Sequence, residues 1–179
     1  LYIAQGLSNP YFEMNTSEAL RINTLANNTM KYLCFVRTTA DTMYGSDGVN
    51  TIRSTTNPAD GGTAWSAQTT VGSSYYSITR MIENSGALYI MKTDLPYYLS
   101  SAGAVQIDLA PELITETHSS DNGKNAVIWQ SGLYMPWGNS SLLENKDGVN
   151  TFRSPALFAT NLADFNGQVF AIVGDSAYL

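Results

Sequence analysis

The sequence has very little of the chemistry on which metal sites, disulfides and most nucleophilic enzymes depend. Its 179 residues include one cysteine, Cys34, and one histidine, His118. A single cysteine excludes an intrachain disulfide, and its apolar neighbours at 32–36 predict a buried small hydrophobe rather than a reactive thiol. A single histidine in a polar loop has no partner with metal-ligand spacing, so we expect no metal and no cofactor.

Charged residues are also scarce, and their balance is negative. They make up 13% of the chain, and the formal net charge at pH 7 is −6. We expect no nucleic-acid partner, because the favourable electrostatic contribution of phosphate contacts is missing. The sequence has no apolar stretch near 18 residues and no signal-peptide pattern, so we expect no membrane insertion. Leu1 is not an initiating methionine and Leu179 ends inside a predicted strand, so we expect a longer parent polypeptide.

Hydrophobic residues make up 44% of the chain, which is enough for a folded single domain over residues 1–179. The clearest pattern lies in Ile78–Leu109. Four short runs of apolar, β-branched and aromatic residues alternate there with turn residues, and the runs are 78–82, 87–91, 97–99 and 105–109. Turn chemistry at every gap predicts one four-stranded antiparallel meander.

The centre of this meander recurs along the chain. Each copy is an aliphatic residue followed by an aromatic one, and the copies are Leu1-Tyr2, Met43-Tyr44, Leu88-Tyr89, Leu133-Tyr134 and Val169-Phe170. Their spacings are 42, 45, 45 and 36 residues. A four-stranded unit repeated at this interval is typical of a β-propeller blade. The sequence therefore predicts an all-β propeller with complete blades centred near Met43, Leu88 and Leu133, partial blades at both ends, and a larger parent ring.

One turn, Asn57–Trp65, has a more specific pattern. Asp60, Gly62 and Trp65 have the spacing D-x-G-x-x-W, which resembles the Asp-box, or bacterial neuraminidase repeat, of sialidase-type propellers. The serine or threonine that normally stands two places before the aspartate is Pro58 here. The resemblance implies a structural hairpin between the third and fourth strands of a blade. In it the aspartate accepts hydrogen bonds from turn amides, a glycine supplies a positive φ, and the tryptophan fills the gap between blades. The alternative is a glycine-rich hairpin without that ancestry.

The same resemblance raises a sialidase-like glycoside hydrolase as the alternative function. That family holds the substrate carboxylate with three arginines and uses a tyrosine–glutamate nucleophile pair. Arg37 and Arg80 are predicted to end innermost strands near the axial face where such a site would lie, while the remaining arginines are Arg21, Arg53 and Arg153. None of them stands in the R-I-P motif of that family. We therefore predict no catalytic residue. We expect Arg37 and Arg80 to be solvent-exposed side chains at the ends of strands.

Aromatic residues are the other functional signal. Tyr75-Tyr76, Tyr97-Tyr98 and the segment 134–137 are candidates for a stacking platform for sugars or a contact face for proteins, whereas Tyr89 and Tyr134 are expected in the core. Several short sequence segments resemble parts of propellers in structural proteins of tailed bacteriophages. These segments are 77–80, 86–89, 96–99, 121–123 and 129–138.

That resemblance implies a binding or structural protein rather than an enzyme. We expect a virion-associated propeller of a phage tail or capsid, which mediates protein or surface-glycan contacts. Its expected partners are other virion or surface proteins and glycans within a larger assembly. Its expected location is the virion, or otherwise the extracellular space or cell surface.

Overall fold

The computed structural model describes residues 1–6, 8–100, 102–107, 118–137 and 141–152, together with the backbone of three strands within 161–178. No helix occurs among these residues, and all regular structure is antiparallel β-sheet. Within the same residues there is accordingly no helix long and apolar enough to cross a membrane.

The strands form five sheets, and in each sheet they follow chain order. The first sheet contains β1 (Tyr2–Ile3), β2 (Phe12–Met14) and β3 (Leu20–Ile22). The second contains β4 (Tyr32–Val36), β5 (Thr42–Ser46), β6 (Thr51–Thr55) and β7 (Thr69–Thr70). The third contains β8 (Ile78–Asn84), β9 (Ala87–Lys92), β10 (Pro96–Ser100) and β11 (Gly103–Gln106). The fourth contains β12 (Val127–Trp129), β13 (Gly132–Trp137), β14 (Ser141–Lys146) and β15 (Val149–Phe152). The fifth contains β16 (Asn161–Phe165), β17 (Gln168–Val173) and β18 (Ser176–Tyr178).

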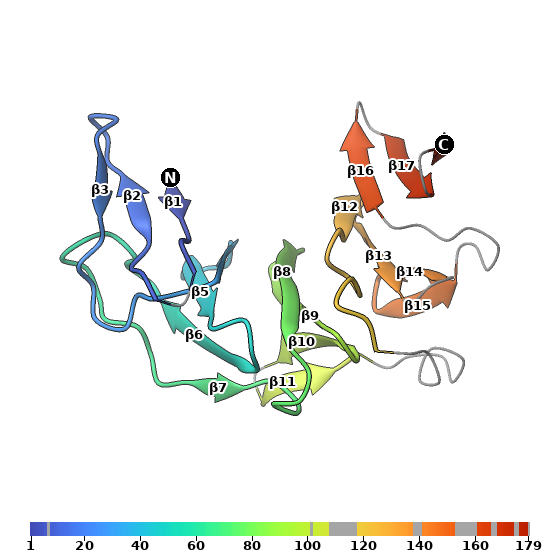
Figure 1. Ribbon diagram of the computed structural model, residues 1–179, viewed down its shortest axis with the longest axis horizontal. Coiled ribbons are helices and arrows are strands. Elements are labelled where there is room, and N and C mark those ends of the chain that lie inside the picture. The colour runs from blue at the N-terminus through green and yellow to red at the C-terminus, as the bar shows by residue number, and fades with distance from the viewer. Residues whose placement is uncertain are drawn as a thin grey trace.

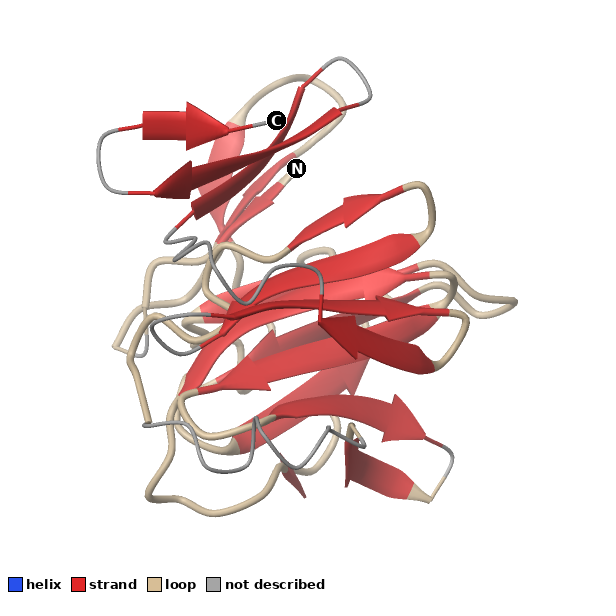
Figure 2. Ribbon diagram, turned by 90° about the vertical axis from the view of Figure 1, so that its right-hand side faces the viewer, coloured by secondary structure: helices blue, strands red, loops and turns tan. Residues whose placement is uncertain are grey.

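The five sheets are arranged side by side around one axis, like the blades of a propeller. Figure 1 shows β1, β8, β12 and β16 on the inner side of the arc and the later strands of each sheet farther out. Figure 2 shows the same sheets from the side, with their strands running roughly parallel to the axis of the arc. An open sector separates the first and fifth sheets in Figure 1. The predicted all-β propeller fold is confirmed.

The meander predicted in Ile78–Leu109 is confirmed as the third sheet, although Leu109 lies outside the described residues. Met43, Leu88 and Leu133 all lie in second strands, which are β5, β9 and β13. The pair Leu1-Tyr2 differs, because Tyr2 belongs to β1, the edge strand of the first sheet. The aliphatic–aromatic pattern therefore identifies an apolar strand, and the neighbouring strands decide its position in the blade.

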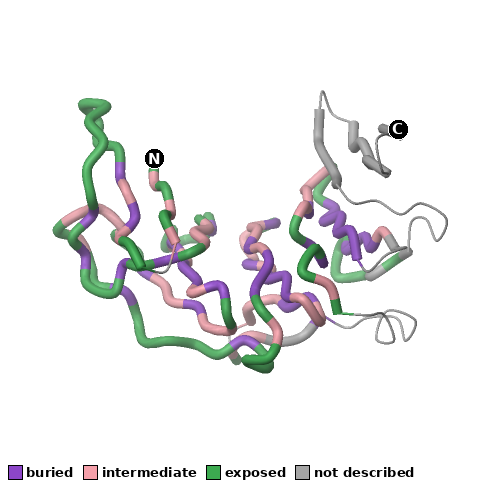
Figure 3. The backbone as a smooth tube through the Cα atoms, viewed as in Figure 1, coloured by how far each residue is buried: buried purple, intermediate pink, exposed green. Residues whose placement is uncertain are grey.

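The cores lie between neighbouring sheets, where side chains of one blade pack on those of the next. Figure 3 shows the buried residues along the strands of these sheets. Between the second and third sheets, Val36 and Ile52 pack with Leu88 and Ile90, all nearly inaccessible to solvent. Between the third and fourth sheets, the buried residues are Met91, Ile107, Ala126, Leu133, Met135, Trp137 and Leu143. Successive residues of one strand thus point to opposite sides of the sheet, one toward the preceding sheet and the next toward the following sheet, as a propeller requires.

The first sheet has one covered face and one open face. Glu13 is 4% exposed and points toward the second sheet, although it is a carboxylate. The opposite face carries Ile3 and Ile22, which align with Phe12 in the strand register and are 42% and 54% exposed. An apolar sheet face open to water is the reverse of the usual arrangement. It is the face that a further blade would cover in a closed ring.

Candidate functional site

The sheets present two different ends, which we call the connector end and the hairpin end. In the second sheet, Met43 of β5 pairs with Phe35 of β4 and with Thr55 of β6. The β4–β5 turn and the start of the β6–β7 loop therefore lie together at the hairpin end. The opposite end of the sheets holds the connectors between blades. There the amide of Ile78, the first residue of β8, donates to the carbonyl of Val49 after the β5–β6 turn, at 3.0 Å.

At the connector end, three segments distant in sequence are joined by backbone hydrogen bonds. The amide of Thr93 donates to the carbonyl of Ser77 at 2.9 Å, and the carbonyl of Thr93 accepts from the amide of Ser119 at 3.1 Å. These bonds bring Tyr76 and His118, each one residue before a bonded serine, into contact. Their rings lie 4.3 Å apart between centroids with a tilt of 34°. The Asn122 amide group also donates to the Thr93 carbonyl, at 2.8 Å.

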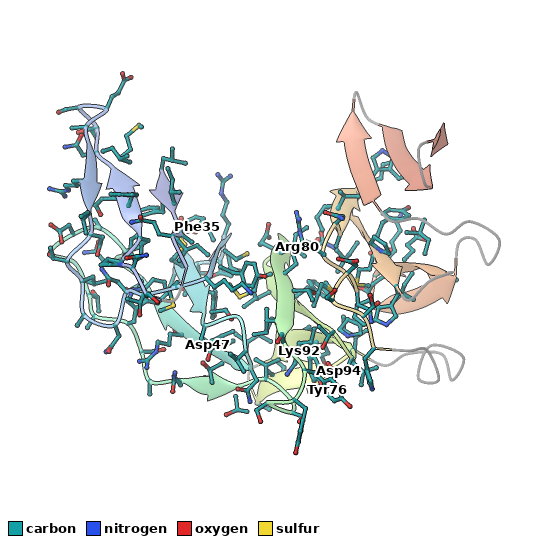
Figure 4. All side chains as sticks on the ribbon, in the orientation of Figure 1. Phe35, Asp47, Tyr76, Arg80, Lys92 and Asp94 are labelled. Carbon is teal, nitrogen blue, oxygen red and sulfur yellow. The ribbon has the colours of Figure 1, made fainter. Side chains whose placement is uncertain are left out.

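Lys92 anchors the connector that carries the tyrosines. Its side chain is fully buried, and its ammonium donates to the carbonyls of Val71 and Ser73 at 2.5 and 2.7 Å. The ammonium also lies 5.7 Å from the centroid of the Tyr97 ring. Figure 4 shows Lys92 close to Asp94 and Tyr76 at this end of the third sheet. A buried cation with two carbonyl acceptors fixes the path of the loop between β7 and β8.

The electrostatics around Lys92 are set by burial and two carboxylates. Burial lowers the pKa of the lysine, while the negative charges of Asp94 and Asp47 act in the opposite direction. Burial also raises the pKa of the Tyr97 hydroxyl to about 12, with Asp94 adding to the shift. The Tyr97 hydroxyl therefore remains protonated near neutral pH and is not poised as a proton acceptor.

A polar pocket lies nearby, between the connector that follows the first sheet and the second sheet. Its volume is about 190 Å³, and it is lined by Asn27, Thr29, Met30, Gly45, Asp47, Thr51, Arg53 and Gln68. Its carboxylate is already engaged, because Asp47 accepts from the amides of Val49 and Thr51 and from the Thr51 hydroxyl. Asp47 therefore caps the β5–β6 turn.

A second pocket, of about 520 Å³, opens between the first and second sheets near their inner strands. It is lined by Leu1, Tyr2, Leu33, Phe35, Arg37 and Met43. Its polar side chains are Tyr2 and the exposed Arg37. No carboxylate or histidine contributes to this described lining.

The turn that resembles an Asp-box lies between β6 and β7, the third and fourth strands of its sheet. Trp65 is 5% exposed and packs with Tyr11 and Leu25 of the first blade, so its predicted burial between blades is confirmed. The Asp60 carboxylate instead accepts mainly from Thr24, through the amide at 2.7 Å and the hydroxyl. The expected bond within the turn comes from the backbone of Gly61, but it is a smaller contribution than those of Thr24, because the loop packs against the residues that follow β3.

The two glycines of this turn have separate roles. Gly61 has a φ of +79° and open space around it, so it supplies the positive φ. A side chain at Gly62 would meet the carbonyl oxygen of Ala59 at 2.7 Å and that of Asn57 even more closely. Gly62 is therefore required for close backbone approach rather than for a left-handed conformation.

The predicted arginines do not form a carboxylate clamp. Arg37 follows β4 at the hairpin end, whereas Arg80 is the third residue of β8, near the connector end, and donates to the carbonyl of Lys124 at 3.1 Å. Arg21 is engaged by Glu13, and Arg53 donates to the carbonyl of Ser66 at 3.1 Å. Arg153 lies outside the described residues. The expectation that Arg37 and Arg80 both end inner strands at one face was therefore wrong, because they sit at different depths along the axis.

A tyrosine–glutamate pair does occur in the fourth sheet. The hydroxyl of Tyr134 donates to Glu144 Oε1 at 2.7 Å, and the two residues are cross-strand partners in β13 and β14. They are 9% and 1% exposed. A sugar cannot reach this pair in the folded sheet, and the geometry is that of a buried carboxylate satisfied by a hydroxyl. The predicted core position of Tyr134 is confirmed.

Two features of the site differ in how far the sequence revealed them. Tyr75 and Tyr76 were singled out by their adjacency, and Tyr75 is 91% exposed. Lys92 was missed, because a lysine at the end of a strand is usually a solvated residue. The signal that could have indicated it is its position directly after the apolar run Ile90-Met91.

Cys34 is half-buried, and burial raises its pKa to about 12, as expected for an unreactive thiol.

No group of three or more histidine, cysteine, aspartate or glutamate side chains that could hold a metal ion occurs among the described residues. The residues that could bind a ligand are instead the aromatic and hydroxyl groups of the connector end. Stacking and neutral hydrogen bonding are the chemistry that they offer.

Comparison with known proteins supports the fold. No family model matches the chain, and no curated protein matches it in sequence. Among solved structures, a streptogramin B lyase superposes with a TM-score of 0.67 at 13% identity, covering 96% of this chain and 58% of the lyase. Virginiamycin B lyase from Staphylococcus aureus gives a TM-score of 0.64 at 9% identity, covering 98% of this chain and 60% of the lyase.

A third similar structure is an extracellular domain from B. thetaiotaomicron, with a TM-score of 0.62 and 15% identity. The match covers 96% of this chain and 25% of that chain. The chain thus spans about six-tenths of the length of the lyases. At such identities the similarity establishes a β-propeller fold, and the function must be argued from the site.

Proposed function

We propose that this chain is a non-enzymatic binding and structural propeller, whose connector end makes the functional contacts. Its role is that of a virion-associated protein of a phage tail or capsid, which contacts other proteins or surface glycans. The sequence resemblance to phage propeller segments supports the virion association. The extracellular domain among the similar structures is consistent with an extracellular location for this chain.

The observation that carries the proposal is an exposed aromatic surface on a fixed loop. Tyr75 is 91% exposed, while Lys92 in the same blade is fully buried and holds the carbonyl of Ser73, two residues before Tyr75. A loop whose backbone is already held loses little conformational entropy when its aromatic side chain binds a partner. Burial raises the pKa of Tyr97 to about 12, and Lys92 is engaged by the carbonyls of Val71 and Ser73, which suits binding better than acid–base chemistry.

Binding of the intact parent protein to host-surface preparations and to purified virion proteins tests the proposal. We expect Tyr75→Ala to weaken binding and Val149→Ala to leave it unchanged. Val149 is a suitable control because it is 63% exposed and follows the β14–β15 turn, at the hairpin end. Equal binding by both variants would exclude the connector end as the contact surface.

The alternative, a sialidase-like hydrolase, is tested by turnover of a fluorogenic sialoside by the intact parent protein. We expect none, since Arg37 and Arg80 cannot hold one carboxylate and the Tyr134–Glu144 pair is buried. Turnover that is abolished by Arg37→Ala and by Arg80→Ala would establish the hydrolase instead.

A further inference from the structure

We propose that Tyr75, Tyr76 and His118 form a carbohydrate subsite that takes a neutral sugar ring. We call these three residues the aromatic platform. The inference rests on the proposed function, because it assigns a ligand class to the same connector end. Tyr75 and Tyr76 come from the connector before the third sheet, and His118 comes from the connector before the fourth.

The platform is built and held in place rather than merely exposed. The Tyr76 and His118 rings are stacked at 4.3 Å between centroids, and the backbone bonds from Thr93 to Ser77 and Ser119 fix both connectors to one turn. The amide of Tyr75 donates to the Ser73 hydroxyl at 3.2 Å, which shapes the turn before it. The Tyr76 and His118 rings and the backbone that carries Tyr75 therefore have defined positions before any ligand arrives, which lowers the entropic cost of binding.

The surroundings of the platform favour a sugar over a protein surface. The neighbouring residues Ser73, Ser74, Ser77 and Ser120 are exposed. Serine is depleted in protein interfaces, and the described residues at 72–77 and 118–121 include no exposed aliphatic side chain that would add an apolar core. Hydroxyl groups around an aromatic face match a sugar, which offers an apolar ring face and a rim of hydroxyls.

The charge of the platform favours a neutral sugar over an acidic one. The described charged residues nearest in sequence to His118 are Asp121 and Lys124, whose side chains pair at 3.5 Å, and Glu116, two residues before His118, lies outside the described residues. Lys92 is enclosed and already donates to two carbonyls, so it offers no charge to a ligand. No arginine belongs to the described parts of either connector, and Arg80 of β8 is engaged by the carbonyl of Lys124. Neither connector therefore offers its own guanidinium to a carboxylated sugar.

Calorimetric titration of the intact chain with neutral oligosaccharides tests the proposal, using cellopentaose, maltopentaose, laminaripentaose and chitopentaose as probes. We expect at least one of them to bind, and Tyr75→Ala to weaken that binding about tenfold, the loss expected for one stacked ring. Tyr75→Trp should retain binding, because it keeps the stacking face. Val149→Ala should match the unsubstituted chain.

Three results would overturn the proposal. These are binding of none of the neutral probes, binding that Tyr75→Ala leaves intact, and binding restricted to an acidic probe such as sialyllactose. The failure can be separated from failure of the proposed function. If Tyr75→Ala abolishes binding to a purified virion protein while no saccharide binds, the connector end is a protein contact and only the carbohydrate assignment falls.

Discussion

The indole of Trp65 meets the phenol ring of Tyr11 edge to face, with ring centroids 6.1 Å apart and an interplanar angle of 86°. The two rings belong to different blades, so this contact joins the first blade to the second. We expect Trp65→Ala to lower the free energy of unfolding by about 3–5 kcal/mol, as removal of a buried aromatic side chain does. Denaturant unfolding of the two proteins measures the difference. Trp65→Phe should cost less, because part of the edge-to-face contact remains.

The same variant separates a structural residue from a recognition residue. Folded Trp65→Ala should keep its ligand, because the β6–β7 loop begins at the hairpin end and the proposed contacts lie at the connector end. A variant that keeps its melting temperature and loses its ligand would show that Trp65 takes part in recognition.

The two glycines of the β6–β7 loop should respond differently to alanine. Gly62→Ala places a methyl group against the carbonyl oxygens of Asn57 and Ala59, and both are backbone atoms that cannot swing away. Gly61→Ala meets no atom and only has to adopt a φ of +79°, at a cost of about 1 kcal/mol. We therefore expect the larger fall in melting temperature for Gly62→Ala. The opposite order would mean that the loop can move off its close contact.

Glu13 should make the stability of the protein depend on pH in the acid range. Burial alone would raise the pKa of this carboxyl, but hydrogen bonds from Arg21, Asn23 and the amide of Asp60 outweigh burial and lower it. Because the folded pKa is lowered, the stabilisation is fully present above the ordinary pKa of 4.5 and is lost as the pH falls through the folded value. The lowered pKa of Asp60 contributes with the same sign.

Unfolding free energies measured between about pH 6 and about pH 3 test this dependence. Glu13→Gln should be less stable at the upper end of this range and should lose less stability toward the lower end. Asp41→Asn is the matched control, since Asp41 is exposed, and its curve should follow that of the unsubstituted protein. Parallel curves for Glu13→Gln and the unsubstituted protein would contradict the assignment.

Lys92 should matter for the loop that carries Tyr75 as well as for overall stability. Lys92→Met leaves the carbonyls of Val71 and Ser73 without their donor, at a cost of about 1–3 kcal/mol. We expect faster amide exchange and earlier proteolytic cleavage within residues 72–77, together with weaker ligand binding. Lys124→Met removes an exposed lysine and should change none of these. Unchanged exchange in Lys92→Met would show that other contacts hold the loop.

The sequence alone determined the fold class of this protein. Turn residues at every gap of Ile78–Leu109, and the recurrence of an aliphatic–aromatic pair at Met43, Leu88 and Leu133, are local features that need no tertiary information. Strand period and turn chemistry act over a few residues, so they can be read directly from the chain. The burial of Trp65 could be predicted for a similar reason, because its spacing within the turn resembles a known structural hairpin.

Only the tertiary structure decided which side chains meet. Asp60 bonds mainly to Thr24 from the preceding blade, Arg37 and Arg80 lie at different depths along the axis, and Lys92 is enclosed by a connector that starts 21 residues before it. His118 joins Tyr76 because backbone bonds bring two connectors to one turn. These contacts arise from blades packing face to face, which pairs residues separated by a whole repeat, and nothing in their local sequence encodes the partner.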